Sequence, residues 1–370
     1  MPTNQITSLK VFADKRVLIT GDTGFKGGWL AAWLSILGAK VFGLADRVPT
    51  VPSFYEACAL PTKLQHSLGD VRDLAFVKKA LESVQPDYVF HLAAQALVRR
   101  AYKDPHEAFT TNTMGTLNML EALRHYKKRC AAIFITSDKA YDNLEWPWGY
   151  RETDALGGKD PYSGSKGAAE CVLKSYSRSY FDEAASPVKV AVTRAGNVIG
   201  GGDWAEDRIV PDAVRAWSAE KELTIRSPDA IRPWQHVLEP LSGYLHLASK
   251  LAHDSALNGE AFNFGPAADQ VFTVEELLRA LGRHWPKAKW SSSAPQNAKM
   301  PEASLLKLNC DKALHKLGWE STLTFSECVE FTAEWYSVFY QGADVWQITT
   351  RQIELYTKIA KERGRKWALL

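Results

Sequence analysis

Short apolar runs alternate with longer amphipathic stretches over the first half of the chain. Five apolar runs have the length of strands, at residues 17–20, 40–45, 88–93, 131–136 and 188–194. Stretches with apolar residues at helical spacing lie between them, and the two longest span residues 109–125 and 161–181. Alternating strands and helices are typical of a parallel sheet with helices on both faces, so we expect an α/β fold with a doubly wound sheet.

The pattern becomes irregular after the glycine run at residues 200–202, and shorter helical segments follow near residues 210–219, 274–284 and 311–317. We expect a smaller C-terminal α/β domain there, which covers the open end of the sheet and binds the substrate. In this division the sheet domain comprises residues 1–196 and roughly 234–264, and the smaller domain comprises residues 197–233 and 265–370.

A glycine-rich turn follows the first strand and precedes an amphipathic helix. Its sequence is Gly21-Asp22-Thr23-Gly24-Phe25-Lys26-Gly27. Such glycines permit a tight turn, let the backbone approach a pyrophosphate and let the helix pack on its strand, while the helix N-terminus offers free N–H groups to the anion. The turn predicts a Rossmann-type dinucleotide site contacted by Gly21, Thr23, Gly24, Phe25, Lys26 and Gly27.

The end of the second strand indicates which dinucleotide binds. Asp46 lies about 20 residues beyond the last glycine, where an acid can hold a ribose 2'-hydroxyl. Its carboxylate would repel a 2'-phosphate and so favours NAD, whereas the neighbouring Arg47 is the residue type that the 2'-phosphate of NADP would attract. We expect NAD.

Two further segments are expected to contact the cofactor. Asp70-Val71 either places a carboxylate near the adenine or provides the N-cap of a helix expected at residues 73–83. Leu92-Ala93-Ala94 follows the third strand, and the small Ala93 and Ala94 would let a nicotinamide ribose approach the backbone.

A tyrosine and a lysine four residues apart open the helix expected at residues 161–181. Tyr162 and Lys166 lie on one helix face, so the ammonium group can approach the phenol and favour its ionised form. An ordinary phenol has a pKa of about 10, and a lower pKa would let Tyr162 accept an alcohol proton near neutrality. Ser137-Asp138-Lys139 follows the fourth strand and should lie at the same edge of the sheet.

Composition argues against several other classes of protein. The 370 residues carry a net charge of +3 with acids and bases interspersed, which argues against a nucleic-acid or membrane-surface patch. The five cysteines are scattered and form no Cys-x-x-Cys pair, so neither a disulfide framework nor a metal site is expected. Residues 1–15 lack an apolar segment of signal-peptide type and no apolar run has membrane-spanning length, so we expect a cytoplasmic protein.

Several strings resemble the extended short-chain dehydrogenase/reductase family, and within it the sugar-nucleotide 4,6-dehydratases. The resemblance covers nearly the whole chain, and its most specific strings are Thr23-Gly24-Phe25-Lys26-Gly27-Gly28-Trp29, His91-Leu92-Ala93-Ala94-Gln95, Thr136-Ser137-Asp138-Lys139, Asn197-Val198-Ile199-Gly200-Gly201-Gly202-Asp203-Trp204, Arg232-Pro233-Trp234-Gln235-His236-Val237 and Phe262-Asn263-Phe264-Gly265-Pro266. It implies NAD as the cofactor, CDP-glucose as the substrate and CDP-4-keto-6-deoxyglucose as the product. It also implies a homodimer or homotetramer.

The resemblance assigns roles to the residues around the sugar. Tyr162 would take the proton from the 4-hydroxyl, with Lys166 holding its pKa down and contacting the nicotinamide ribose. Ser137 would hydrogen-bond the same oxygen, and Asp138 would protonate the departing 6-hydroxyl. Lys139 stands where related dehydratases commonly have a glutamate base, and it acts either as a neutral base at C5 or as a charge that stabilises the enolate.

The substrate diphosphate needs cations and hydrogen-bond donors. The resemblance implies that Arg232 and Asn197 bind it. Arg99 and Arg208 are candidates from charge and position, and Gln95, at the end of the third strand, is a further expected substrate contact.

Two alternative functions remain open. A nucleotide-sugar 4-epimerase shares the tyrosine and lysine but needs no elimination, so Asp138-Lys139 argues against it. A non-catalytic NAD-binding regulator would have lost the chemistry, and the intact set of Ser137, Asp138, Lys139, Tyr162 and Lys166 argues against that.

Overall fold

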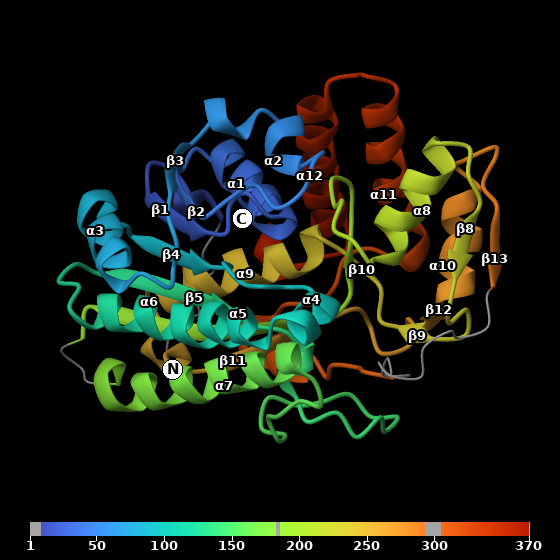
Figure 1. The fold of residues 1–370 in the computed structure, drawn as a ribbon. Coiled ribbons are helices and arrows are strands. Elements are labelled where there is room, and N and C mark those ends of the chain that lie inside the picture. Colours follow the sequence, from blue (N-terminus) through green and yellow to red (C-terminus); the bar gives the residue numbers. More distant parts are fainter. Residues whose placement is uncertain (1–8, 183–185, 293–304, 370) are drawn as a thin grey trace.

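A seven-stranded parallel sheet forms the centre of the protein in the computed structural model, which describes residues 9–182, 186–292 and 305–369 (Figure 1). Its strands are β1 (Arg16–Thr20), β2 (Lys40–Ala45), β3 (Gln65–Leu68), β4 (Tyr88–His91), β5 (Cys130–Ile135), β6 (Val188–Ala195) and β11 (Ala261–Phe264). They lie in the order β11-β6-β5-β4-β1-β2-β3, and every neighbouring pair is parallel. The expected doubly wound sheet is confirmed, and its order reverses between β1 and β4, where such folds bind ligands.

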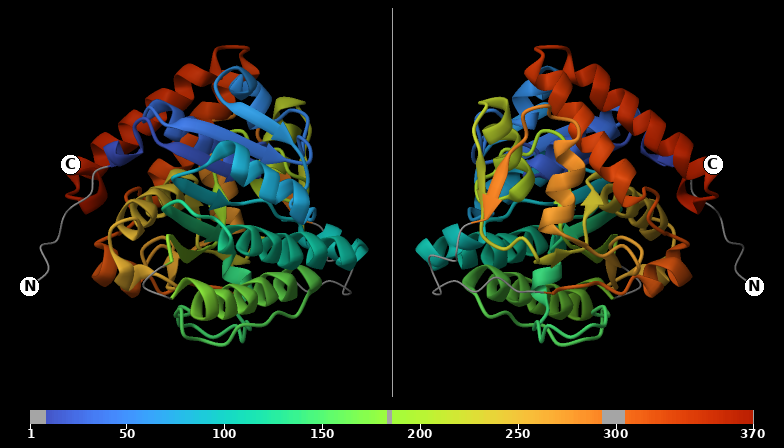
Figure 2. Two further views of the ribbon diagram at one scale, coloured as in Figure 1. Left: turned by 90° about the vertical axis from the view of Figure 1, so that its left-hand side faces the viewer. Right: turned by 90° about the vertical axis from the view of Figure 1, so that its right-hand side faces the viewer.

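Alternate residues of each strand face opposite layers of helices. On β1, Leu18 packs with α3 (Leu74–Val84), α6 (Gly115–Arg124) and α7 (Pro161–Tyr176). Its neighbours Val17 and Ile19 join the core that includes α1 (Phe25–Ile36) and α9 (Leu238–Leu251). Because both faces are covered, the strands are nearly continuous apolar runs. In Figure 2 the green helices lie on one side of the sheet and the red C-terminal helices on the other.

The two long helices that the pattern predicts are present, with interruptions. Helix α7 begins after Asp160, whose side chain accepts a hydrogen bond from the Ser163 amide, and it is followed by a π-helical turn at Ser177–Phe181. The predicted 109–125 helix is formed by the end of α5 (Pro105–Phe109), a π-helical turn at Thr110–Met114 and α6.

The second half of the chain adds short paired strands beside the carboxyl ends of the sheet. These are β7 (Val198–Ile199) with β10 (Gln235–His236), β9 (Ile231–Arg232) with β12 (Phe272–Thr273), and β8 (Leu223–Ile225) with β13 (Trp290–Ser292). The helices α8 (Ile209–Ser218) and α10 (Val274–Gly282) accompany them, close to the predicted positions.

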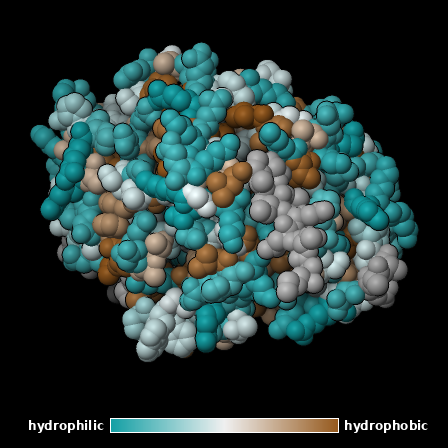
Figure 3. Space-filling model, turned by 180° about the vertical axis from the view of Figure 1, so that it is seen from behind, coloured by the Kyte–Doolittle hydropathy of each residue, from teal (hydrophilic) through white to brown (hydrophobic). Residues whose placement is uncertain are grey.

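Two C-terminal helices that the sequence pattern did not predict complete the fold. They are α11 (Phe325–Tyr340) and α12 (Val345–Glu362), and α12 packs on α1, where the rings of Trp33 and Tyr356 meet edge to face with centroids 5.8 Å apart. Within the described ranges, no helix has both the length and the apolar character needed to cross a membrane. The face in Figure 3 is largely hydrophilic, with separate hydrophobic areas.

Candidate active site

The glycine turn after β1 has a shape that only glycine permits at two of its positions. Gly21 has a φ of +77°, and a Cβ atom there would lie 2.8 Å from the backbone nitrogen of Ala93. A Cβ atom on Gly27 would lie 2.0 Å from the carbonyl oxygen of Gly21. The turn is therefore pressed against the Leu92–Ala93 backbone on one side and against the first turn of α1 on the other.

The N-terminus of α1 suits an anionic group. Gly24 is its N-cap and has no side chain to bond the first amides, and its first turn holds no acidic residue. Helix N-termini carry unpaired N–H groups and a partial positive charge, so this one fits a pyrophosphate. Thr23 takes another role, because its hydroxyl donates to the carbonyl oxygen of Arg47 at 2.7 Å.

Lys26 is buried near charged residues that follow β5 and β6. Burial lowers its pKa to about 8, and the charge of Arg208 adds to this effect, whereas Asp138 and Asp203 oppose it. The sequence predicts a cofactor contact for Lys26, and the structure puts its charge within range of the acid Asp138 as well.

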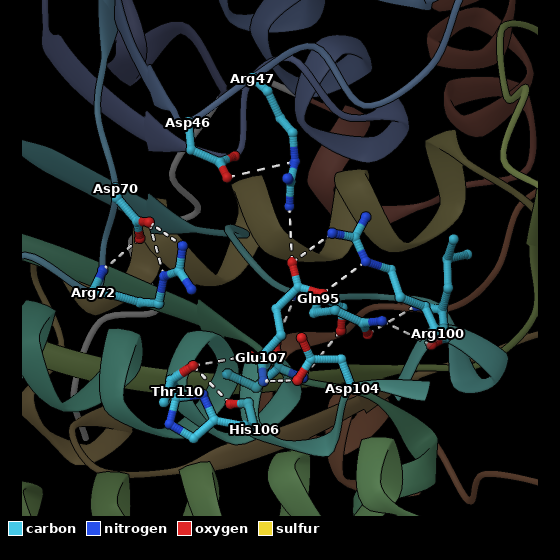
Figure 4. Close-up of polar contacts among 12 residues, drawn as sticks. Asp46, Arg47, Asp70, Arg72, Gln95, Arg100, Asp104, His106, Glu107 and Thr110 are labelled. Atoms are coloured by element: carbon cyan, nitrogen blue, oxygen red, sulfur yellow. Dashed lines mark hydrogen bonds and ion pairs between the residues drawn. The ribbon is translucent and has the colours of Figure 1, made fainter. Parts of the chain in front are cut away.

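Carboxylates at the ends of β2 and β3 hold the basic residues beside them (Figure 4). The Asp46 carboxylate lies 3.5 Å from the Arg47 guanidinium, and the Asp70 carboxylate accepts a hydrogen bond from Arg72 Nε at 2.8 Å. The N-cap alternative for Asp70 is wrong, since Asp73 caps α3 by accepting from the amide of Ala75 at 2.9 Å.

The residues after β5 form a tight turn that holds the predicted catalytic residues Ser137, Asp138 and Lys139, and we call it the catalytic turn. Ser137 Oγ donates to Asp138 Oδ1 at 2.9 Å and accepts from the amide of Lys139 at 3.2 Å, and residues Asp138–Ala140 form a single 3-10 turn. Burial raises the pKa of Asp138, although the charges of Lys139 and Lys26 work against this. A carboxyl group with a raised pKa can carry a proton and donate it as a general acid.

Tyr162 and Lys166 are both buried on the face of α7 that looks toward this turn. Burial raises the pKa of Tyr162 to about 12, and a hydrogen bond with Ser137 and the charge of Arg208 lower it only in part. The expected lowered pKa is therefore wrong for this structure, because the loss of hydration outweighs the nearby charges. Burial, with the charge of Lys26, lowers the pKa of Lys166 to about 8.

A buried ion pair behind the catalytic turn was not predicted. Glu170 on α7 and Arg194 on β6 each have side chains only 3% exposed and form a two-point contact, with Arg194 Nε donating to Glu170 Oε1 at 2.7 Å. Thr136 Oγ1 donates to the same carboxylate oxygen at 2.6 Å, and Arg194 Nη1 donates to the Tyr141 hydroxyl at 2.6 Å. The spacing Tyr162, Lys166, Glu170 along one helix face is a signal that could have identified Glu170.

The predicted substrate contacts lie in three places. Arg208 lies 2.7 Å from the Asp203 carboxylate and is close enough to Tyr162 to affect its pKa, and Arg99 lies 2.9 Å from Asp207 in the same loop. Arg208 therefore lies near Tyr162, and Asp207 ties Arg99 to the same loop. The side chain of Gln95 instead bonds the backbone of Leu97 through both its amide nitrogen, at 3.0 Å, and its amide oxygen, at 3.1 Å.

Of the remaining two predicted substrate residues, Asn197 lies directly before β7 and Arg232 lies on β9. The Asn197 carbonyl oxygen accepts from the amide of Gln235 at 3.1 Å, which ties it to β10. Arg232, on β9, donates from Nη1 to the carbonyl oxygen of Ile231 at 2.8 Å.

The site combines a nucleotide-binding turn with a buried acid beside a tyrosine and a lysine, and arginines lie nearby. This combination defines a Rossmann-fold enzyme of nucleotide-sugar chemistry. The family model described as GDP-mannose 4,6 dehydratase matches residues 18–332, and the chain belongs to this family.

The proteins similar to this chain are named as nucleotide-sugar dehydratases and epimerases. The chain is 43% identical over 346 residues to the CDP-glucose 4,6-dehydratase of Salmonella typhimurium, covering 92% of this chain and 96% of that protein. It is 27% identical over 294 residues to the CDP-paratose 2-epimerase of Salmonella typhi, covering 72% and 83%. Among solved structures, the Thermus thermophilus UDP-glucose 4-epimerase in complex with NAD has a TM-score of 0.73 at 26% identity, covering 87% of this chain and 99% of that one.

Proposed function

We propose that the chain is an NAD-dependent carbon–oxygen lyase that converts CDP-glucose into CDP-4-keto-6-deoxyglucose. The observation that carries the proposal is the buried Asp138 carboxyl, which Ser137 links to Tyr162. Elimination of water needs an acid at the departing hydroxyl, whereas epimerisation at C4 gives such an acid no task. The similarity to the CDP-glucose 4,6-dehydratase supports the choice of substrate.

NAD fits the residues present. The first turn of α1 would hold its pyrophosphate, Asp46 its adenosine ribose, and Lys166 its nicotinamide ribose. Asp70, Val71, Leu92, Ala93 and Ala94 complete the proposed set of contacts. When bound, NAD supplies the two-electron oxidation at C4 and the matching reduction at C6.

The chain's own residues move the protons. Tyr162 accepts the proton of the sugar 4-hydroxyl, while Ser137 hydrogen-bonds the same oxygen. The resulting 4-ketone acidifies the C5 proton, and Lys139 acts at C5 as a base or as a positive charge. Asp138, with its raised pKa, gives its proton to the departing 6-hydroxyl.

Arginines and the segments after β6 would hold the rest of the substrate. Arg208, near Tyr162, and Arg99, tied to the same loop through Asp207, suit the diphosphate, to which Arg232 on β9 and Asn197 directly before β7 would add contacts. Residues 197–233 would thus form part of the substrate side of the site. A cytoplasmic location and a homodimer or homotetramer stay predictions.

A single incubation tests the proposal. Purified protein supplied with NAD and CDP-glucose should yield a sugar nucleotide that is lighter by one water, measured by mass spectrometry. A product of unchanged mass with inverted C4 would indicate a 4-epimerase, and bound NAD without any product would indicate a non-catalytic protein.

A further inference from the structure

Arg47 stands where an NADP-binding protein would have an arginine, directly after the acid that favours NAD. A 2'-phosphate on the adenosine ribose attracts arginine, whereas a 2'-hydroxyl needs an acceptor such as Asp46. The sequence alone therefore presents both preferences side by side. Which of the two cofactors is preferred depends on what the Arg47 guanidinium contacts in the folded protein.

The structure gives Arg47 two carboxylate partners. Its Nη2 donates to Glu107 Oε1 at 3.0 Å, and its Nε lies 3.5 Å from Asp46 Oδ2 (Figure 4). Glu107 comes from α5, far from Arg47 in the sequence, so this contact exists only in the folded protein. Both partners are negative, and together they neutralise the one cation that directly follows Asp46.

Glu107 is held firmly in its place. Arg100 donates to the Glu107 carboxylate at two points, from Nε at 2.7 Å and from Nη2 at 2.5 Å. The backbone amide of Glu107 donates to Asp104 Oδ1 at 2.8 Å. Burial alone would raise the pKa of Glu107, but the hydrogen bonds from Arg100 and Arg47 bring it below its ordinary value. Single exposed ion pairs contribute little, but a two-point arginine contact within a network is the exception.

The second basic residue in this region is held in the same way. Arg72 donates from Nε to Asp70 at 2.8 Å and from Nη2 at 2.5 Å. Asp46 and Glu107 lie close enough to Arg72 to affect its pKa, and Arg47 lies close enough to Asp70. An incoming 2'-phosphate would therefore meet arginines whose charges are already engaged by carboxylates.

We propose that Glu107 is a specificity-determining residue for the cofactor, because its hold on Arg47 keeps the site selective for NAD over NADP. The inference rests on the proposed binding of NAD. To accept a 2'-phosphate, Arg47 would have to leave Glu107, and the phosphate would then face the carboxylates of both Glu107 and Asp46. The 2'-hydroxyl of NAD needs only the Asp46 carboxylate.

The test compares the dissociation constants of NAD and NADP by calorimetry in the full-length protein. Glu107→Gln should shift the NADP-to-NAD affinity ratio toward NADP on the order of 10-fold, the effect of freeing one charged hydrogen-bond donor. Combining Glu107→Gln with Asp46→Ser should shift the ratio by more than the product of the two single changes, because in each single variant the remaining carboxylate still holds Arg47 in part.

Two controls show whether the effect runs through Arg47. Adding Arg47→Ala to Glu107→Gln should abolish the gain in NADP binding. Glu121→Gln removes a carboxylate on α6 that Arg124 holds in the same two-point manner, with Nε at 2.8 Å and Nη2 at 2.6 Å, and that also accepts from the Tyr176 hydroxyl on α7. This change should leave the ratio at the wild-type value.

An unchanged ratio in Glu107→Gln that still binds NAD would overturn the inference, as would a gain that survives Arg47→Ala. The measurement needs no turnover, so a protein that binds NAD but leaves CDP-glucose unaltered would contradict the proposed reaction alone. A wild type that binds NADP as well as NAD would contradict the assigned selectivity directly.

Discussion

Glu170→Gln leaves the Arg194 guanidinium buried without its counter-charge. Both side chains are only 3% exposed, and Glu170 is the one carboxylate that Arg194 contacts among the described residues. Removing one partner of a buried ion pair costs about 3–5 kcal/mol, because the remaining charge stays desolvated. A domain is stable by only about 5–15 kcal/mol, so the variant should fold but unfold at clearly lower denaturant concentration.

The same change should also slow turnover, because the ion pair holds both ends of the catalytic turn. Thr136, directly before Ser137, bonds Glu170, and Tyr141, directly after Ala140, bonds Arg194. Asn263 on β11 fixes the Tyr141 hydroxyl further, as its Oδ1 accepts from that hydroxyl at 2.9 Å. A displacement of about 1 Å at the reacting groups can lower the rate on the order of 10²-fold.

Two measurements separate stability from positioning. Denaturant unfolding gives the loss of stability, and steady-state kinetics well below the unfolding transition give kcat and KM of the folded protein. We expect kcat to fall on the order of 10²-fold with KM nearly unchanged. In Glu170→Gln/Arg194→Met neither charge is left unpaired, so stability should recover in part while kcat stays low.

Glu239→Gln is the matched control. Glu239 is 1% exposed and accepts hydrogen bonds from the amides of Thr322 and Leu323 and from the Tyr356 hydroxyl, none of which belongs to the catalytic turn. It should lose stability, because the glutamine amide nitrogen cannot accept the hydrogen bonds that both oxygens of Glu239 accept, and it should keep the wild-type kcat. If Glu170→Gln behaves like this control, with full kcat after a loss of stability, the positioning role of the ion pair is refuted.

Three further predictions address the base, the turn and a buried acid. Tyr162→Phe should still bind NAD but lose about 10²–10⁴-fold in kcat, and a rate near that of the wild type would exclude Tyr162 as the base. Gly21→Ala should destabilise the protein by at least about 1–3 kcal/mol in denaturant unfolding, because φ is +77° and the new Cβ atom would meet backbone 2.8 Å away; unchanged stability would count against this tight packing. Burial raises the pKa of Glu239 from 4.5 to about 7, so its protonated form stabilises the protein at low pH and about 3 kcal/mol is lost as the pH rises from 4.5 to 7. Glu239→Gln should flatten the pH dependence of unfolding over that window, and an unaltered pH profile would contradict the assignment.

Burial explains why the apolar pattern predicts β2 and misses β3. The β2 strand is an apolar run at residues 40–45, and the structure has it at Lys40–Ala45, as expected for a strand covered on both faces. The β3 strand was missed because Gln65, His66 and Ser67 are polar, and they can be polar because β3 is the edge strand and mostly exposed. A continuous apolar run identifies a strand only where both faces are buried.

The C-terminal helices were missed although their start signals are present. Thr324 and Glu327 form a capping box at the start of α11, and Asp344 caps α12. The apolar faces of these helices pack on distant parts of the chain, as Tyr356 does on Trp33. Capping signals therefore predict these two helices better than the hydrophobic pattern, which was interpreted as irregular after residue 202.

The charge state of the site follows from burial, which residue spacing does not show. Helical spacing correctly put Tyr162 and Lys166 on one face, and from this a lowered tyrosine pKa was expected. Burial disfavours both charged forms, so it raises the pKa of Tyr162 to about 12 and lowers that of Lys166 to about 8. In the proposed mechanism, proton transfer to Tyr162 then depends on the positive charge of the whole pocket, to which Arg208 contributes directly and Lys26 contributes through its charge near Asp138. The glycine turn, the catalytic turn and the loop before α8 thus form one electrostatic unit, although they are far apart in the sequence.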